Sequence, residues 1–179
     1  MGSGKIICAV RNNVELSKAL SSKQSIVFLL STNIEEVQGQ IALAHQKGKK
    51  LFVHVDLAEG IGKDVYGIRY LKNVGVDGII STRTNIIKFA RQEGLATVQR
   101  FFIVDSHSVD TTVDSAITSK ADMIEIMPGT VTKVITKLKG LLNAPIVAGG
   151  LIESEEEVEN AINSGAAAVS TGKSKLWEI

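Results

Sequence analysis

The sequence is poor in the residues that mark several protein classes. It has one cysteine, Cys8, among 179 residues, so no disulfide can form within the chain and a reducing compartment is indicated. Its apolar runs fall far short of the roughly 20 residues that a membrane-spanning helix needs. Residues 1–5 lack the apolar stretch of a secretory signal. We therefore expect a cytoplasmic protein with no membrane segment.

The sequence also lacks an excess of positive or negative charge. Twenty lysine and arginine residues face 19 acidic residues, a formal net charge of +1, which excludes both a histone-like cation and an acidic disordered chain. A local basic face remains compatible with nucleic-acid binding. Aromatic residues make up only 4% of the chain, whereas hydrophobic residues make up 44% and are mostly aliphatic. That composition is typical of a buried parallel sheet.

Short runs rich in β-forming residues alternate with segments of helical periodicity. Such alternation indicates an α/β fold, either an open doubly wound sheet or a closed barrel. There are eight such runs, which favours a closed TIM-type (β/α)8 barrel formed by residues 1–179 as one domain. Because 179 residues are few for this fold, we expect short or missing helices, at residues 31–33 and 173–179. The predicted strands are residues 6–10, 26–30, 51–55, 78–81, 96–100, 123–127, 146–148 and 167–170.

Ligands of such barrels bind at the carboxyl ends of the strands, so polar residues there are candidates. Alternation along residues 51–56 places Phe52, His54 and Asp56 on one face, and His54 and Asp56 are predicted to point into the barrel mouth. By the same rule Glu125 shares that mouth. A histidine beside two carboxylates indicates an acid/base set, a divalent metal site or hydrogen-bonded structural residues.

Glycines follow the seventh predicted strand and small hydroxyl residues end the eighth. Gly149, Gly150, Ser170 and Thr171 therefore predict a phosphate site, because bare backbone N–H groups can approach an anion closely there. The alternative is that these glycines serve only tight turns.

Basic residues gather in two segments, residues 83–100 and 130–143. They could form an electropositive face suited to a phosphodiester backbone, or simply lie on solvated helix faces. The candidates for RNA binding are Arg83, Lys88, Arg91, Arg100, Lys133 and Lys137.

Several blocks of the chain are more specific than these patterns. They are VHVDL at 53–57, GIISTR at 78–83, QRFF at 99–102, IEIMPG at 124–129 and PIVAGGLI at 145–152. Together they resemble the glycerol-3-phosphate-responsive antiterminators, the glycerol uptake operon antiterminator regulatory proteins of bacteria. The resemblance covers nearly the whole chain in order.

The resemblance implies a regulator without catalysis, and we expect no metal or cofactor. It implies that the ligand is glycerol 3-phosphate and that the liganded protein binds leader messenger RNA and prevents transcription termination. Gly149, Gly150, Ser170 and Thr171 would then hold the phosphate. The glycerol hydroxyls would be bound by His54, Asp56, Gln99 and Glu125.

Two other functions stay open at this point. One is an enzyme acting on a small phosphorylated substrate, with His54, Asp56 and Glu125 as acid/base residues or metal ligands. The other is a ligand sensor that contacts another protein. The sequence also leaves the oligomeric state open, a homo-oligomer included.

Overall fold

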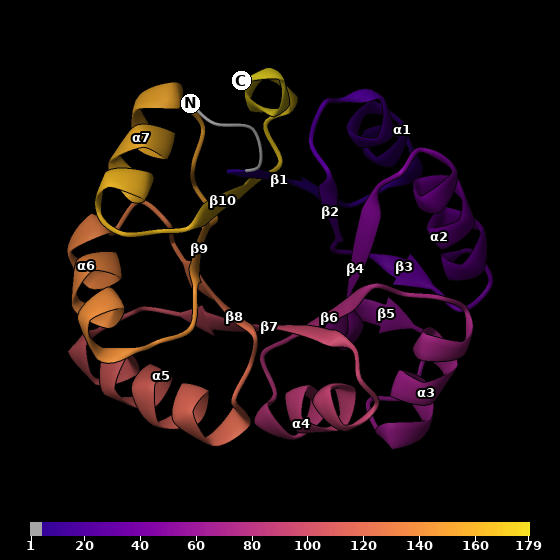
Figure 1. Ribbon diagram of the computed structural model, residues 1–179, viewed down its shortest axis with the longest axis horizontal. Coiled ribbons are helices and arrows are strands. Elements are labelled where there is room, and N and C mark those ends of the chain that lie inside the picture. Colours follow the sequence, from indigo (N-terminus) through magenta and orange to yellow (C-terminus); the bar gives the residue numbers. More distant parts are fainter. Residues whose placement is uncertain (1–4) are drawn as a thin grey trace.

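The computed structural model describes residues 5–179, and its centre is a closed barrel of eight parallel strands. Around the barrel the strands follow the order β1-β10-β9-β8-β7-β6-β4-β2 (Figure 1). Three predicted strands have their predicted bounds, and the other five shift by one or two residues. This confirms the TIM-type barrel. The barrel strands are β1 (Ile6–Val10), β2 (Ile26–Leu29), β4 (Lys50–His54), β6 (Gly78–Ser81), β7 (Ala96–Phe102), β8 (Met123–Met127), β9 (Ile146–Gly149) and β10 (Ala168–Thr171).

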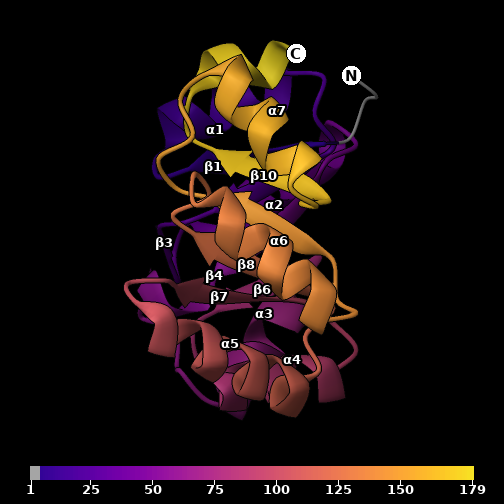
Figure 2. The ribbon, with the colours of Figure 1, turned by 90° about the vertical axis from the view of Figure 1, so that its left-hand side faces the viewer.

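Seven α-helices cover the outside of the barrel in the part of the chain that the structure describes (Figures 1 and 2). Where an eighth helix would follow β10 there is only the 3-10 turn η2 (Ser174–Glu178), so the predicted economy at the end of the chain is confirmed. The same prediction for residues 31–33 was wrong, because that connection continues into a ten-residue helix. The helices are α1 (Asn13–Ser21), α2 (Val37–Gln46), α3 (Val65–Asn73), α4 (Thr84–Gln92), α5 (Ser106–Ser119), α6 (Thr132–Leu141) and α7 (Glu155–Asn163).

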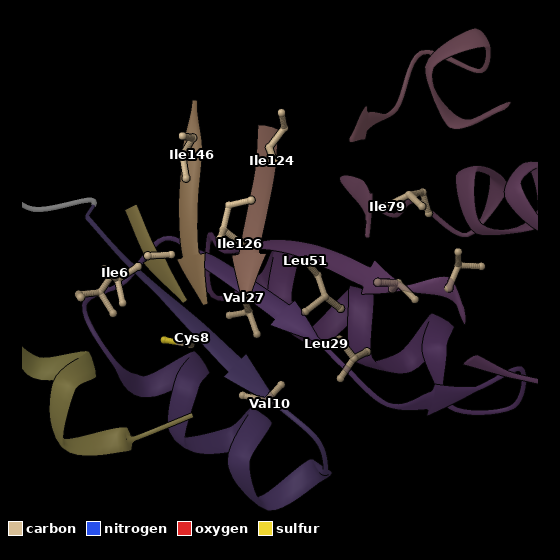
Figure 3. Packing of buried hydrophobic residues seen from close by; sticks show 14 of the residues in the cluster. Ile6, Cys8, Val10, Val27, Leu29, Leu51, Ile79, Ile124, Ile126 and Ile146 are labelled. Carbon is tan, nitrogen blue, oxygen red and sulfur yellow. The ribbon is translucent and has the colours of Figure 1, made fainter. Parts of the chain in front are cut away.

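Side chains alternate between two cores along the barrel strands. One cluster fills the space between barrel and helices and includes Cys8, Leu51 and Ile79 (Figure 3). The other lies inside the barrel and includes Phe28, Phe52 and Val147 from different strands. The rings of Phe28 and Phe52 lie 5.6 Å apart, a normal tilted aromatic contact. Away from the carboxyl ends of the strands, the barrel interior is therefore packed with apolar side chains. The polar side chains that could bind a ligand lie at those carboxyl ends.

Short-range hydrogen bonds cap the start of α7 and hold the end of β10 in place. The side chain of Ser154 accepts from the backbone N–H of Glu157, whose carboxylate caps the start of α7 in return. At the end of the chain the indole Nε1–H of Trp177 donates to the carbonyl of Thr171 at 2.8 Å, which holds η2 against β10.

Two short strands, β3 (Thr32–Asn33) and β5 (Ala58–Glu59), pair with each other outside the barrel. They join the connection after β2 to the connection after β4, where the 3-10 turn η1 (Val55–Leu57) follows. No described helix is long and apolar enough to cross a membrane.

Candidate functional site

A buried ion pair lies inside the barrel at the level where the strands end. Arg100 and Glu125 are opposite each other on β7 and β8, and Nε of Arg100 donates to Oε2 of Glu125 at 2.6 Å. The hydroxyl of Ser170 donates to Oε1 of the same carboxylate, also at 2.6 Å. A Cβ on Gly149 would lie 2.5 Å from Oε1 of Glu125, so only glycine leaves room for this carboxylate. The predicted position of Glu125 in the barrel is thus what the structure has.

Arg100 has N–H donors that its ion pair with Glu125 does not use. Its terminal Nη atoms make no hydrogen bond with any described residue, and they are not among the buried atoms that lack a partner. They therefore reach open space. Arginine presents a planar set of N–H donors that matches carboxylate or phosphate oxygens, so this side chain offers an anion or polyol contact.

That space is a cavity of about 350 Å³ above the ion pair. Charged residues and bare backbone form much of its wall. It is lined by Ala9, Arg11, Leu30, Arg100, Glu125, Met127, Gly150, Leu151, Ile152, Glu153, Ser170, Thr171, Gly172 and Lys173. Within this set Arg100 pairs with Glu125 and Lys173 with Glu153 at 3.0 Å, which leaves the guanidinium of Arg11 in excess. The cavity wall therefore favours an anion.

Residues whose backbone N–H groups have no partner within the described chain line this cavity in the loops after β9 and β10. The amides of Gly150, Leu151 and Gly172 make no hydrogen bond among the described residues. Gly150 and Leu151 are both left-handed, with φ of 73° and 59°. That conformation costs a leucine about 1–2 kcal/mol. Since the Leu151 side chain is 69% exposed, packing does not offset the strain, as is typical of a binding loop.

The two hydroxyl residues of the predicted phosphate site have structural partners as well. Ser170 donates to Glu125, and Thr171 donates to the carbonyl of Ile152 at 2.8 Å and accepts from the N–H of Lys173. Gly150 lies at the cavity as predicted, whereas Gly149 serves to admit the carboxylate of Glu125. The groups left free to donate at this site are therefore backbone amides and arginines rather than hydroxyl groups.

His54 is buried at the end of β4, with 4% of its surface exposed. Neither ring nitrogen has a hydrogen-bond partner among the described residues. Burial, together with the charge of nearby Arg100, lowers the pKa of His54 from 6.5 to about 4. The ring is consequently neutral at physiological pH and keeps one donor and one acceptor that no described residue uses.

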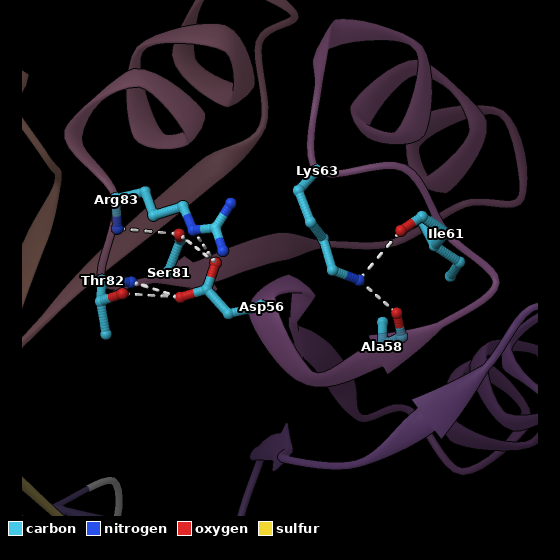
Figure 4. Close-up of polar contacts among 7 residues, drawn as sticks. All are labelled: Asp56, Ala58, Ile61, Lys63, Ser81, Thr82 and Arg83. Atoms are coloured by element: carbon cyan, nitrogen blue, oxygen red, sulfur yellow. Dashed lines mark hydrogen bonds and ion pairs between the residues drawn. The ribbon is translucent and has the colours of Figure 1, made fainter.

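Asp56 does not extend the inward face of β4 as predicted, because the strand ends at His54 and the chain turns into η1. Its carboxylate instead accepts from the hydroxyl of Ser81 at 2.7 Å and from the N–H and hydroxyl of Thr82 (Figure 4). Burial raises the pKa of Asp56, but these hydrogen bonds outweigh it and hold the pKa below its usual value. Asp56 thus ties the ends of β4 and β6 together, with Nε of Arg83 3.9 Å away.

Gln99 also lies away from the cavity. Since Arg100 points into the barrel, its neighbour Gln99 points to the helix side, where Nε2 donates to the hydroxyl of Thr84 at 3.1 Å. Its Oε1 is buried without a partner. The structure thus separates Gln99 from His54 and Glu125, with which it was grouped.

The candidate RNA-binding residues fall into three separate places. Arg83, Lys88 and Arg91 are exposed on or beside α4, although Arg91 pairs with Asp122 at 2.8 Å. Lys133 and Lys137 are exposed on α6, on the other side of α5 (Figure 1). Arg100 is 6% exposed inside the barrel, so it belongs with the cavity rather than with a surface for a nucleic acid.

Several cavity residues were missing from the predicted site, among them Arg11, Leu151 and Gly172. Each directly follows a barrel strand or lies in the loop behind it, which is the signal that could have identified them. Residues 5–179 contain no group of three or more histidine, cysteine or acidic side chains placed to hold a metal ion.

Comparison with known proteins places this geometry in a family. A family model described as glycerol-3-phosphate responsive antiterminator matches residues 6–177. The chain is 38% identical over 175 residues to the uncharacterized protein YgcP of Escherichia coli, covering 97% of this chain and 92% of the relative.

Two solved structures are similar over almost their whole length. The glycerol uptake operon antiterminator regulatory protein of Listeria monocytogenes is 35% identical with a TM-score of 0.94, covering 99% of this chain and 96% of its own. A glycerol uptake operon antiterminator-related protein of Thermotoga maritima is 30% identical with a TM-score of 0.88 over the full length of both chains. An aldolase at 16% identity, with a TM-score of 0.77 over 95% of this chain and 90% of its own, shares the barrel fold alone.

Proposed function

This chain belongs to the glycerol-3-phosphate responsive antiterminator family, and on that premise we propose that it senses glycerol 3-phosphate in the cavity at the barrel mouth. In its liganded form it binds leader messenger RNA of glycerol-utilisation genes and prevents transcription from terminating. The names of the similar proteins from Listeria and Thermotoga support this role.

The observation that carries the ligand assignment is the meeting of two kinds of contact in one small cavity. The free amides of Gly150, Leu151 and Gly172, with the guanidinium of Arg11, suit a phosphate group. The Nη donors of Arg100 and the carboxylate of Glu125 suit vicinal hydroxyl groups. The size of the cavity, about 350 Å³, suits a small molecule.

His54 lies near Arg100 but is not among the residues that line the cavity, so in this proposal it contacts the ligand through a bridging water. It is buried close to Arg100 and has two unpartnered ring nitrogens, and a buried polar atom without a partner costs roughly 1–3 kcal/mol. A water that bridges the ring to a ligand hydroxyl would recover that free energy. We therefore place the glycerol end of the ligand toward His54 and the phosphate toward the loops after β9 and β10.

We further propose that the protein binds its ligand without converting it. An acid/base reaction would need His54 and Asp56 to face one substrate, but the carboxylate of Asp56 is engaged with Ser81 and Thr82 outside the cavity wall. Glu125 already accepts one hydrogen bond on each oxygen, from Arg100 and Ser170. This arrangement supports a fixed binding site.

The test combines ligand binding with RNA binding. Calorimetry should detect glycerol 3-phosphate binding at one site per chain, with glycerol and inorganic phosphate as controls that each supply half of the contacts. Labelled leader RNA titrated with and without glycerol 3-phosphate should show tighter binding with the ligand. By linkage, RNA must raise the affinity for the ligand by the same factor. Identical RNA isotherms in the two conditions would overturn the regulatory role.

A further inference from the structure

A second hollow, the α5/α6 groove, lies on the outside of the protein between the starts of α5 and α6. It has a volume of about 450 Å³, and five aliphatic side chains form most of its wall. Its lining residues are Ile103, Val104, Asp105, Ser106, Val109, Val131, Lys133, Val134 and Lys137. Buried Val109 and Val134 close the floor of the groove, so the packing around the barrel is complete without an occupant in the groove.

The surface beside the groove exposes apolar side chains that a water-facing loop does not require. Val104 in the groove wall is 83% exposed, and Phe102, which precedes the groove residue Ile103 and lies on the same face of β7 as Arg100, is 58% exposed. Large apolar side chains that are adjacent and exposed often mark an interaction site. An exposed aromatic ring is notable in a chain with only 4% aromatic residues.

The charge around the groove favours an anionic partner. Lys133 and Lys137 are exposed one helical turn apart on α6, and neither forms a salt bridge with any described residue. One acid lies at the rim, Asp105, and its carboxylate already caps α5 by accepting from the N–H and hydroxyl of Ser108. Two unpaired ammonium groups therefore dominate this surface.

The α5/α6 groove shares a segment of chain with the ligand cavity. The carbonyl of Met127 accepts from the N–H of Ile103, which lines the groove, at 2.8 Å. The side chain of Met127 lines the cavity, and its Cε would lie 2.7 Å from a Cβ on Gly150. Two residues further on, Gly129 donates its N–H to the carbonyls of Gly149 and Gly150. The cavity and the groove are therefore connected through residues 127–129 and their backbone hydrogen bonds.

Resting on the proposed function, we propose that the α5/α6 groove is where the leader RNA docks, as a single strand. One base stacks on Phe102, a neighbouring base contacts the apolar wall of the groove, and the phosphates of the strand contact Lys133 and Lys137. Proteins hold single-stranded nucleic acid by combining exposed aromatic rings with cationic side chains. The alternative surface on α4 lacks these features, since its Arg91 is paired with Asp122.

Two exposed substitutions test this surface with little risk to the fold. With glycerol 3-phosphate saturating, Phe102→Ala should weaken leader-RNA binding by about tenfold. Lys137→Ala should reduce the slope of log affinity against log salt by about 0.7, the contribution of one single-strand phosphate contact. Lys88→Ala on α4 is the matched control, an exposed helical lysine outside the groove, and should bind RNA like the unchanged protein. All three should bind glycerol 3-phosphate normally in the absence of RNA.

The outcomes separate the two proposals. The docking of RNA at the groove is refuted if ligand-dependent RNA binding survives in Phe102→Ala and Lys137→Ala, or if it is lost in Lys88→Ala. Either result leaves the proposed function standing. If the unchanged protein binds ligand but no leader RNA, the proposed function itself fails, and the proposal that RNA docks at the groove fails with it. Capture of a protein on the groove in place of RNA counts against the proposal in the same way.

Discussion

His54 should make the stability of the unliganded protein depend on pH. The folded protein holds the pKa of this ring at about 4, against its ordinary value of 6.5. Below pH 6.5 the unfolded chain therefore binds a proton that the folded protein does not, so the free energy of unfolding decreases as the pH falls. At about 1.36 kcal/mol for each pKa unit, His54 alone should remove about 2 kcal/mol between pH 7.5 and pH 5.

The measurement compares urea unfolding of the unchanged protein and His54→Leu, followed by circular dichroism at both pH values. Every other titrating group, including His45 and His107, is common to the two proteins, so the difference between their pH dependences reports on His54 alone. His54→Leu should lose about 2 kcal/mol less than the unchanged protein over this range. Equal losses would refute the argument that a buried, unpartnered and neutral imidazole occupies the barrel.

Three further results are expected. Gly150→Val forces a β-branched residue into φ of 73° with its Cβ 2.7 Å from Cε of Met127, so calorimetry should show at least tenfold weaker glycerol 3-phosphate binding while circular dichroism keeps the barrel signal; undiminished binding would contradict the phosphate site. Glu125→Ala leaves the guanidinium of Arg100 buried without its partner, which should cost about 3–5 kcal/mol in urea unfolding, and a cost under 1 kcal/mol would mean that the pair is dispensable. Glycerol 3-phosphate at one hundred times its Kd should add about 2.7 kcal/mol to the free energy of unfolding of the unchanged protein, whereas an equal concentration of glycerol should not.

The barrel could be predicted from the sequence because parallel strands buried on both faces leave a repeated signal. Each strand is an aliphatic run, and the helical segments between them have their own periodicity, so both strand number and order followed from local patterns. The prediction failed at residues 31–33, where a short strand pair and α2 occupy a connection that was expected to be short. Chain length limits the total length of helix but does not say which connection is short.

The site was less predictable, because it depends on register and on backbone conformation. The inward position of Glu125 followed from alternation. Its pairing with Arg100 depends on the register between β7 and β8, which cannot be predicted from the sequence of either strand alone. The position of Asp56 depended on β4 ending one residue earlier than predicted. The free amides of Gly150 and Leu151 result from two successive left-handed residues, and nothing in a leucine side chain signals that conformation.

The contact that fastens the end of the chain also gives the protein an optical probe of its own. Trp177 is the one tryptophan in the sequence, it is 1% exposed, and its indole bonds to the carbonyl of Thr171, immediately before Gly172 at the cavity. Its fluorescence therefore arises from a single site whose hydrogen-bond acceptor belongs to β10, the strand that ends at the cavity. Rapid-mixing emission measurements could thus follow the arrival and departure of ligand in real time, on unlabelled protein with every residue intact.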